Sequence, residues 1–351
     1  MRARLDTSIV EPLFAYYWFS EPYVQEYIRS RNTGSTIPLI NLSVLKSLPI
    51  PVPPIDTQHG ILGVIATLDD RIDLLRQTNA TLESIAQALF KSWFIDFDPV
   101  RAKAEGRDPE GMDPATVALF PSEFEDSPLG LIPTGWNVKK LGDYLELTKG
   151  CSYKGEGLAE ADGAFMFNLG CFNAHRVFAS EKVKRYTGEY RPRHAVVPGD
   201  LIMANTDMTQ ARDILGRPAF VPEGFAPGFI SHHVFKVTMK ATDPQIAHAQ
   251  RLFLFFALQQ EAFRERAIGF ATGTTVLALP AAAVMECPSC MPPDSALSHF
   301  AGVVDPLLKR LRQNEQTADR LAELRDTLLP RLISGKLRLP EAAREIEEAL
   351  A

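Results

Sequence analysis

The hydrophobic pattern is most regular in residues 60–97, where apolar side chains recur at alternating steps of four and three. The positions on this seam are Ile61, Ile65, Leu68, Ile72, Leu75, Leu82, Ala86, Leu89 and Trp93. Asn79 fills the one step that lacks an apolar residue. Such a heptad seam predicts a long helix that packs along its length against another helix. Because prolines at 53 and 54 break regular structure just before it, we assign this helix to 54–97.

A second heptad seam lies near the other end of the sequence, in residues 294–337. Its positions are Phe300, Val304, Leu307, Leu311, Asn314, Ala318, Leu321, Arg325, Leu328 and Leu332. When Asn79 is placed opposite Asn314 in an antiparallel pair, seam positions meet throughout, and only Leu68 opposite Arg325 is mismatched. A lone polar pair fixes register because only one alignment satisfies it. We predict an antiparallel coiled coil of about 50 Å; the alternative is that each helix packs on its own globular body.

The chain between and around these helices predicts an α+β fold with one complete globular domain. Residues 98–131 are polar, acidic and rich in Pro and Gly, which predicts a linker with one short helix. Residues 132–293 contain short β-like runs near 164, 201, 218 and 234, followed by a helical run over 246–267. This length is ordinary for a domain. Residues 338–351 are interpreted as an acidic tail.

A long-range repeat links residues 1–53 to the end of this domain. Leu13-Phe14 matches Leu252-Phe253, the segment 33–36 matches 272–275, and Pro53 matches Pro292, all at an offset of about 239 residues. The repeat predicts that residues 1–53 are the C-terminal remnant of a first such domain. Its aromatic helix is then expected to expose apolar surface that a missing domain would cover.

Composition excludes several classes of protein. The 351 residues carry a net charge of −6, which argues against a uniformly basic nucleic-acid binder, although residues 136–240 are mildly basic. No run reaches the roughly 18 apolar residues of a membrane span, and the N-terminus lacks the apolar core of a signal peptide. With only four cysteines, a reducing cytoplasm is the expected location.

Motifs for catalysis are missing from the sequence. We find no nucleotide-binding P-loop, no dinucleotide-binding glycine motif, no zinc-protease helix and no serine-hydrolase elbow. Cys287 and Cys290 have the spacing of half a zinc site, but Cys151 and Cys171 do not supply a second pair. We therefore predict no catalytic residues and no metal.

Polar and basic residues between the two helices predict a DNA-recognition surface. Their side chains suit base edges, phosphates or both. The candidates are Lys182, Lys184, Arg185, Asn205, Thr206, Thr209, Gln210, Arg212, His232, Thr272, Thr274 and Thr275. Arg191 and Arg193 extend the basic cluster. For each residue singly, a solvated polar loop, or for His232 a core or surface histidine, remains the alternative.

Several motifs resemble those of the specificity (S) subunit of type I restriction–modification enzymes. Ile132-Pro133, Gly135-Trp136 and 141–143 look like the opening of that family's target recognition domain, and 199–204 like its central strand. Segments 89–100 and 328–337 look like the ends of its two conserved helices. The resemblance covers nearly the whole chain, but members usually carry two complete recognition domains, and this chain lacks most of the first.

The resemblance implies a non-catalytic role in a larger complex. It implies that the recognition domain reads one half of a split sequence in double-stranded DNA, and that the coiled coil sets the gap between the halves. It also implies docking to modification (methyltransferase) subunits that bind S-adenosylmethionine, and to restriction (motor-nuclease) subunits that use ATP and Mg²⁺. Pairing with a second copy of the chain would rebuild a symmetric reader. The alternative function is a protein-interaction or scaffold module whose coiled coil is the functional part.

Overall fold

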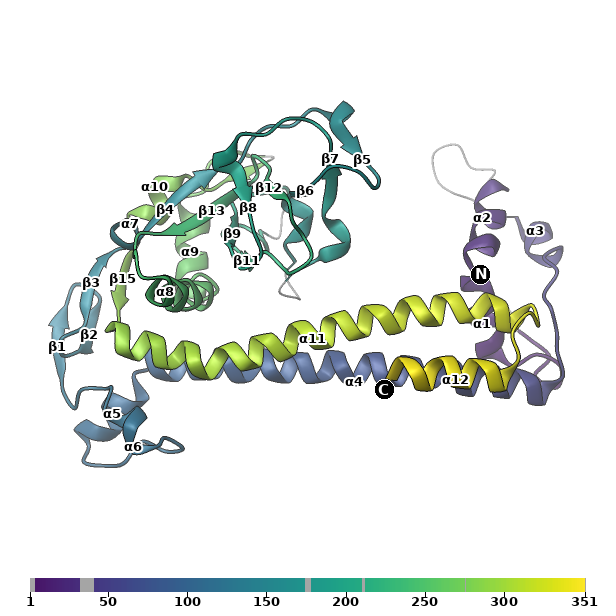
Figure 1. Cartoon of the computed structure of the whole chain (residues 1–351), viewed down its shortest axis with the longest axis horizontal. Coiled ribbons are helices and arrows are strands. Elements are labelled where there is room, and N and C mark those ends of the chain that lie inside the picture. Colours follow the sequence, from purple (N-terminus) through teal and green to yellow (C-terminus); the bar gives the residue numbers. More distant parts are fainter. Residues whose placement is uncertain (1–3, 32–40, 174–177, 210–211, 275, 351) are drawn as a thin grey trace. The chain divides into compact units, whose positions relative to one another are not determined.

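The computed structural model describes residues 4–31, 41–173, 178–209, 212–274 and 276–350. The chain divides into two compact units (Figure 1). The helical unit contains Met1–Ile85 and Leu307–Ala351, and the sheet unit contains Ala86–Pro306. Two helices of 40 residues each, α4 (Ile55–Phe94) and α11 (Asp294–Ile333), contribute residues to both units.

In the helical unit, α4 and α11 pack along the predicted heptad seams. Their seam residues form one buried cluster, which includes Ile61, Ile65, Leu68, Ile72, Leu321, Leu328 and Leu332. Removing these side chains from water at every third or fourth position holds the helices together. The predicted α+β fold with an antiparallel helix pair is therefore confirmed, in place of two helices on separate bodies.

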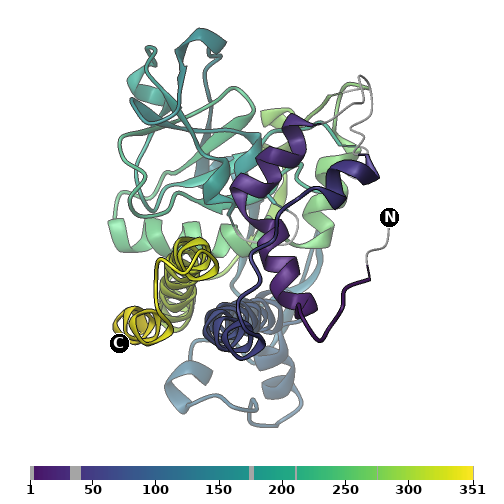
Figure 2. The same cartoon turned by 90° about the vertical axis from the view of Figure 1, so that its right-hand side faces the viewer.

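Two short helices cover one end of this pair, α1 (Pro12–Ser20) and α2 (Pro22–Ser30), as the end-on view in Figure 2 shows. Each begins with a proline, whose fixed φ suits the first helical position. Phe14 and Trp18 are almost completely buried in the cluster with α4 and α11. Leu13 and Tyr16, on the other side of α1, are 46% and 63% exposed. The short helix α3 (Leu42–Lys46) follows.

The expected acidic tail instead forms helix α12 (Leu339–Leu350). Ala342 and Ile346 are buried in the same apolar cluster as the α4–α11 seam. Gly60 on α4 permits this packing, because a Cβ there would lie 2.5 Å from Leu339 Cδ1. The acidic residues lie on one side of this helix only. Burial of the apolar residues on its other side stabilises the helix.

The sheet unit is built on two sheets. One has the order β11-β9-β13-β4, with β4 Leu145–Lys149, β9 Leu201–Ala204, β11 Pro218–Phe220 and β13 Val234–Met239. The other has the order β5-β7-β6-β12-β8, with β5 Leu158–Ala159, β6 Ala164–Phe167, β7 Lys184–Tyr186, β8 Ala195–Val196 and β12 Gly228–Ile230. All four residues of β9 are buried, which explains its unbroken apolar sequence. The short β-like runs of the sequence thus form strands.

The predicted helical run after the sheets forms two helices, α8 (Pro244–Ala257) and α9 (Glu261–Gly269). Asp243 caps α8, because its carboxylate accepts hydrogen bonds from the backbone N–H groups of Gln245 and Ile246. Aromatic rings cover two sides of α8. Phe255 packs on Phe220 of the sheet at 4.9 Å between ring centroids. Phe253 and Phe256 pack on Phe90 of α4, at 5.3 and 5.6 Å. The helix thereby joins the sheet to the α4 end inside this unit.

Residues 98–131 contain more regular structure than the linker with one short helix that the sequence predicts. They form α5 (Asp98–Ala104), α6 (Pro114–Val117) and the hairpin of β1 (Phe124–Ser127) with β2 (Gly130–Pro133). Phe120 is 2% exposed and packs edge-on against Trp93 at 5.5 Å. Most of the acidic side chains are exposed, and a few apolar residues form a small core that the overall composition of the segment does not indicate.

Four shorter elements also belong to the sheet unit. Strand β3 (Asn137–Lys140) pairs with β15 (Pro288–Met291), and the helices α7 (Leu141–Tyr144) and α10 (Ala281–Met285) lie beside them. Cys287 directly precedes β15 and Cys290 lies within it, and both are free thiols. Within the described ranges, no three His, Cys, Asp or Glu side chains are grouped to hold a metal. No helix among the described residues is long and apolar enough to cross a bilayer.

Candidate nucleic-acid interface

Two polar loops predicted to contact DNA lie side by side in the sheet unit. The first, residues 205–212, follows the buried strand β9, and the second is 272–278. They are joined where β10 (Thr206–Asp207) pairs with β14 (Leu277–Ala278). A further backbone hydrogen bond of 2.8 Å runs from Leu279 N–H to the carbonyl of Asn205. The strand pairing brings together residues that are about 70 positions apart in the sequence.

Asp207 holds the first loop in shape. It is fully buried, and its Oδ1 accepts hydrogen bonds from both the backbone N–H (2.7 Å) and the hydroxyl (2.8 Å) of Thr209. Its Oδ2 accepts from the backbone N–H of Ile214 at 2.9 Å. A carboxylate that satisfies several donors in a turn holds together the described residues on either side of positions 210 and 211. Asp207 therefore positions the loop, while Thr209 remains exposed.

Asn205 and Thr206 differ from the sequence prediction, because both are buried. Their exposed fractions are 2% and 6%. The Asn205 amide donates to the carbonyl of His232 at 3.2 Å, and the Thr206 hydroxyl lies 2.8 Å from Nδ1 of His233. These side chains tie the loop to the segment before β13 and do not face solvent. As placed, they cannot read base edges, and we correct that prediction.

Among the residues predicted to contact DNA, the described and exposed members of the two loops are Thr209, Arg212, Thr272 and Thr274. Arg212 has a φ of 57°, and its backbone carbonyl accepts a 3.2 Å hydrogen bond from Arg264. The second loop turns at Gly273, where φ is 103° and a Cβ would lie 2.2 Å from the Val276 carbonyl oxygen. Only glycine fits that turn. Gln210 and Thr275, also predicted to contact DNA, lie outside the described residues.

His232 lies at the base of the first loop and is half-buried. Its ring is 3.8 Å from that of His233 and 6.1 Å from that of Tyr153, measured between centroids. Burial, and next the charge of Lys149, lowers the pKa of His232 below its usual value. Its Nδ1 is buried without a hydrogen-bond partner in the described structure. The ring is therefore neutral near pH 7 and suits a hydrogen bond better than a charge contact.

The basic residues predicted to contact phosphate lie on strand β7 of the five-stranded sheet and in the turn just before it. Lys182 ends the short 3-10 turn Ser180–Lys182, Lys184 begins β7, and both are exposed. The Arg185 side chain already makes contacts within the protein. It donates a hydrogen bond to the Gly163 carbonyl at 2.9 Å, and its guanidinium lies 3.4 Å from the Phe165 ring centroid. The structure brings these three together, but on a different sheet from the two polar loops.

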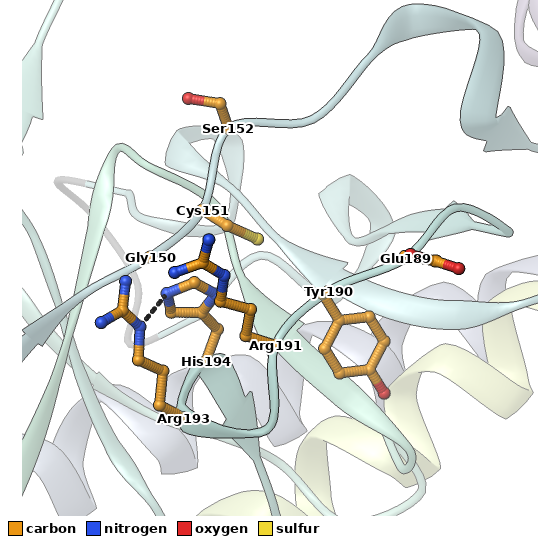
Figure 3. A pocket seen from close by; sticks show the side chains of 8 residues that line it. All are labelled: Gly150, Cys151, Ser152, Glu189, Tyr190, Arg191, Arg193 and His194. Carbon is orange, nitrogen blue, oxygen red and sulfur yellow. Dashed lines mark hydrogen bonds between the residues drawn. The ribbon is translucent and has the colours of Figure 1, made fainter.

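A pocket beside this sheet contains residues that the sequence reasoning largely missed. It is lined by residues 150–152, which follow β4, and 189–194, which lead into β8, and its volume is about 480 Å³ (Figure 3). The sequence pattern indicates only that Arg191 and Arg193 belong to a basic cluster, and it gives no signal for His194. No local sequence signal joins the two segments; the fold alone brings them together.

The helical unit places Asn79 and Asn314 against each other. Asn314 Nδ2 donates to Asn79 Oδ1 at 2.9 Å, and Asn79 Nδ2 donates to the Leu311 carbonyl at 3.1 Å. Asn314 is 3% exposed. Both amides thus find partners inside an otherwise apolar seam.

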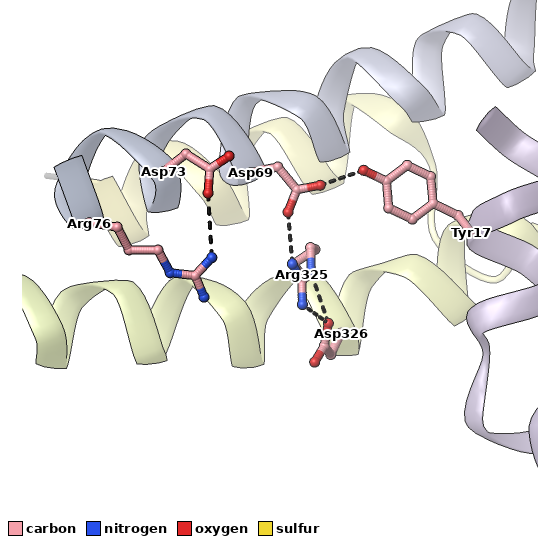
Figure 4. Close-up of polar contacts among 6 residues, drawn as sticks. All are labelled: Tyr17, Asp69, Asp73, Arg76, Arg325 and Asp326. Carbon is pink, nitrogen blue, oxygen red and sulfur yellow. Dashed lines mark hydrogen bonds and ion pairs between the residues drawn. The ribbon is translucent and has the colours of Figure 1, made fainter. Parts of the chain in front are cut away.

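The expected mismatch of Leu68 with Arg325 is avoided. Leu68 is fully buried, and Arg325 turns aside to pair with Asp69 and Asp326, each at 2.7 Å (Figure 4). Asp69 also accepts a hydrogen bond from the Tyr17 hydroxyl of α1. The guanidinium keeps its charge at the edge of the seam while its stem covers apolar surface.

Comparison with known proteins agrees with this architecture. The family model for the Type I restriction modification DNA specificity domain matches residues 4–84. The Type I restriction enzyme MjaIX specificity subunit of Methanocaldococcus jannaschii is 25% identical, over 93% of this chain and 69% of the relative. The HindI specificity subunit of Haemophilus influenzae is 26% identical, over 95% of this chain and 79% of the relative.

A solved structure shares the fold. The S subunit of a type-I restriction-modification system from M. genitalium gives a TM-score of 0.55 at 17% identity, over 93% of this chain and 74% of that one. The fold defines an α+β class in which one chain carries a sheet domain and a long antiparallel helix pair. The sequence matches add that the chain is similar, over nearly its whole length, to specificity subunits of type I restriction–modification systems.

Proposed function

We propose that this chain recognises DNA for a type I restriction–modification complex, and that its sheet unit reads one half-site. The observation that carries the proposal is its likeness to specificity subunits over 93% and 95% of its length. The paired loops 205–212 and 272–278 support it, since they present exposed polar side chains from a rigid sheet.

In this proposal, the two kinds of candidate residue have separate tasks. Arg212, Thr209 and Thr274 are exposed on the paired loops, and Arg and Thr are suited to base edges in the major groove. Lys182 and Lys184 are exposed on the neighbouring sheet and suit phosphates. Phosphate contacts would position the duplex, and the loops would select the sequence.

We assign the chemistry to partner subunits. The modification subunits would bind S-adenosylmethionine and methylate adenine, and the restriction subunits would use ATP and Mg²⁺. The chain itself would act as reader and spacer. A stiff helix pair supports a measuring role, because a flexible linker would blur the spacing between half-sites.

Selection from a pool of random duplexes tests the proposal. The full chain is mixed with modification subunits, and bound DNA is recovered and sequenced over several rounds. We expect a defined half-site to be enriched, with affinity that falls as salt rises. Replacing Arg212 by Gln should relax the preference at one base position, whereas replacing exposed Lys139 should not. A pool that stays random under every salt condition would refute the proposal.

A protein-interaction role remains the second candidate, and one observation favours it. Leu13, Tyr16 and Tyr23 are exposed on α1 and α2 by 46%, 63% and 62%. Exposed apolar side chains of this size suit a protein partner, including a second copy of this chain. Under that function, light scattering should show stable self-association or partner binding in the absence of DNA, and the selected pool should stay random.

A further inference from the structure

The pocket at residues 150–152 and 189–194 concentrates positive charge without a matching carboxylate. Arg191 and Arg193 stand two residues apart, and Figure 3 shows both guanidinium groups beside the ring of His194. Glu189 lies on the far side of the same segment and points away from them. Among the residues that the structure describes, no carboxylate pairs with either guanidinium. Two unpaired guanidinium groups at one hollow are a receptor for an anion.

His194 holds one of these guanidinium groups in place. The Nε of Arg193 donates a hydrogen bond to Nε2 of His194 at 3.1 Å. Nε2 must therefore carry a lone pair, so that the ring is neutral with its proton on Nδ1. Burial, then Arg193 and Arg191, lowers the pKa of His194, which keeps the ring in this accepting form. With Nε occupied, Arg193 has its two terminal nitrogens left for a ligand.

The surroundings of the pocket are rigid. His194 is 3% exposed, and Tyr190 stacks flat on Phe229 at 4.4 Å between centroids. On the opposite strand end, Gly150 sits so close to the backbone of residues 230 and 231 that a Cβ would lie 2.2 Å from the Ser231 carbonyl oxygen. The two segments that frame the hollow are thus fixed before any ligand arrives, which lowers the cost of binding.

We propose that this pocket holds one phosphate group of a nucleic-acid backbone, bound by Arg191 and Arg193, with His194 as the positioning residue for Arg193. This assignment rests on the proposed function for the source of the phosphate. A volume of about 480 Å³ accommodates a phosphate together with its flanking sugars. Arginine pairs with two phosphate oxygens at once, which suits this ligand better than a single lysine charge.

A direct test needs no DNA. The full chain, labelled with ¹⁵N, is titrated with inorganic phosphate while the Nε–H signals of its arginines are recorded. We expect saturable shifts of the Arg191 and Arg193 signals and loss of saturation in the R191Q/R193Q double variant. The Lys139→Gln variant removes one exposed charge elsewhere in the sheet unit and should behave as wild type. Small shifts that do not saturate and that all arginine signals share would refute the proposal that Arg191 and Arg193 bind phosphate in this pocket.

His194 has its own pair of variants. His194→Gln keeps an acceptor for Arg193, and His194→Leu removes it. We expect the Gln variant to retain most phosphate affinity and the Leu variant to lose it by about tenfold, with equal melting temperatures showing that the fold is intact. Equal affinity in both variants would overturn the positioning role.

The source of the phosphate is tested with duplex DNA and modification subunits. Losing one phosphate contact should flatten the slope of log Kobs against log salt by about 0.9 in Arg193→Gln, with an unchanged sequence preference. Lys139→Gln should leave the slope unchanged. Selective DNA binding with an unaltered slope in Arg193→Gln would refute the backbone assignment alone. Saturable phosphate binding by a chain that shows no DNA selectivity would instead refute the proposed function. It would also refute the assignment of the ligand to a DNA backbone, while the pocket would stand as a binding site for an anion.

Discussion

Replacing Asn79 by Leu tests the register of the helix pair most directly. The change removes the oxygen that accepts from Asn314 Nδ2 at 2.9 Å and the amide that donates to the Leu311 carbonyl at 3.1 Å. Asn314 is 3% exposed, so water cannot readily replace the lost partner. An unsatisfied buried amide costs ~1–3 kcal/mol, and we expect the free energy of unfolding to fall by that amount.

The double variant Asn79→Leu/Asn314→Leu separates this cost from a change of helix propensity. Two leucines facing each other leave no unpaired amide in the seam, so the double variant should recover most of the lost stability. A coupling free energy of ~1 kcal/mol or more is expected, as is usual for residues in direct contact. Urea unfolding of the full chain, followed by circular dichroism at 222 nm, measures all four forms.

Gln77→Leu serves as the matched control, because Gln77 is exposed on the same helix. Its effect should stay within ~0.5 kcal/mol. If the double variant is no more stable than Asn79→Leu alone, the two asparagines are not coupled and the reasoning is refuted. The same holds if the control loses as much as the seam variant.

Three further predictions concern charged groups. Arg325→Leu strands the carboxylates that this guanidinium pairs with and should cost ~1–2 kcal/mol, whereas Arg76→Leu breaks an exposed 3.4 Å pair and should cost under ~0.5 kcal/mol in thermal unfolding. Burial, then Asp326, raises the pKa of Glu21 from its usual 4.5 to about 7, so its contribution to stability is present below pH 4.5 and is lost as pH rises to 7. Glu21→Gln should therefore match wild type at pH 4 and exceed it by ~1–2 kcal/mol at pH 8; a constant difference would contradict this. Asp207→Ala frees the ends of the first loop and should reduce sequence selectivity in the duplex selection without changing the salt slope; unchanged selectivity would show that the loop does not read DNA.

The helix pair could be predicted from the sequence because its information is local and periodic. A heptad seam states which face is buried, and one polar position in each seam is enough to align the two. The strand near 201 was visible for a similar reason, since its run of buried residues is apolar throughout. Register, by contrast with most tertiary contacts, needs no knowledge of loop geometry.

Other features depended on contacts that the sequence does not display. Residues 98–131 are acidic enough to suggest a linker, yet Phe120 meets Trp93 and Trp136 in a small core. Asn205 and Thr206 have the side chains of base readers, but their burial is decided by the segment before β13 that packs over them. Polar residues at a loop base and at a loop tip look alike until the partner segments are known.

The polar positions in the seam also explain why the helix pair has one register. Asn79 with Asn314, and Asp69 with Arg325, lie ten or eleven residues apart on each helix, and both pairings require the same alignment. A slip of one heptad would move one helix by ~10 Å along the other and set both asparagines against apolar residues. It would also separate Arg325 from Asp69, so a slipped alignment would lose both polar pairings.

Leucine at both asparagine positions removes the cost of burying unpaired asparagines in a slipped alignment but leaves the cost of separating Arg325 from Asp69. We therefore expect the double leucine variant to keep its register, and the same variant with Arg325→Leu to lose it. Distances between spin labels on α4 and α11 inside the helical unit would show one population in the first case and several in the second; a single population in both would mean that apolar packing alone sets the alignment.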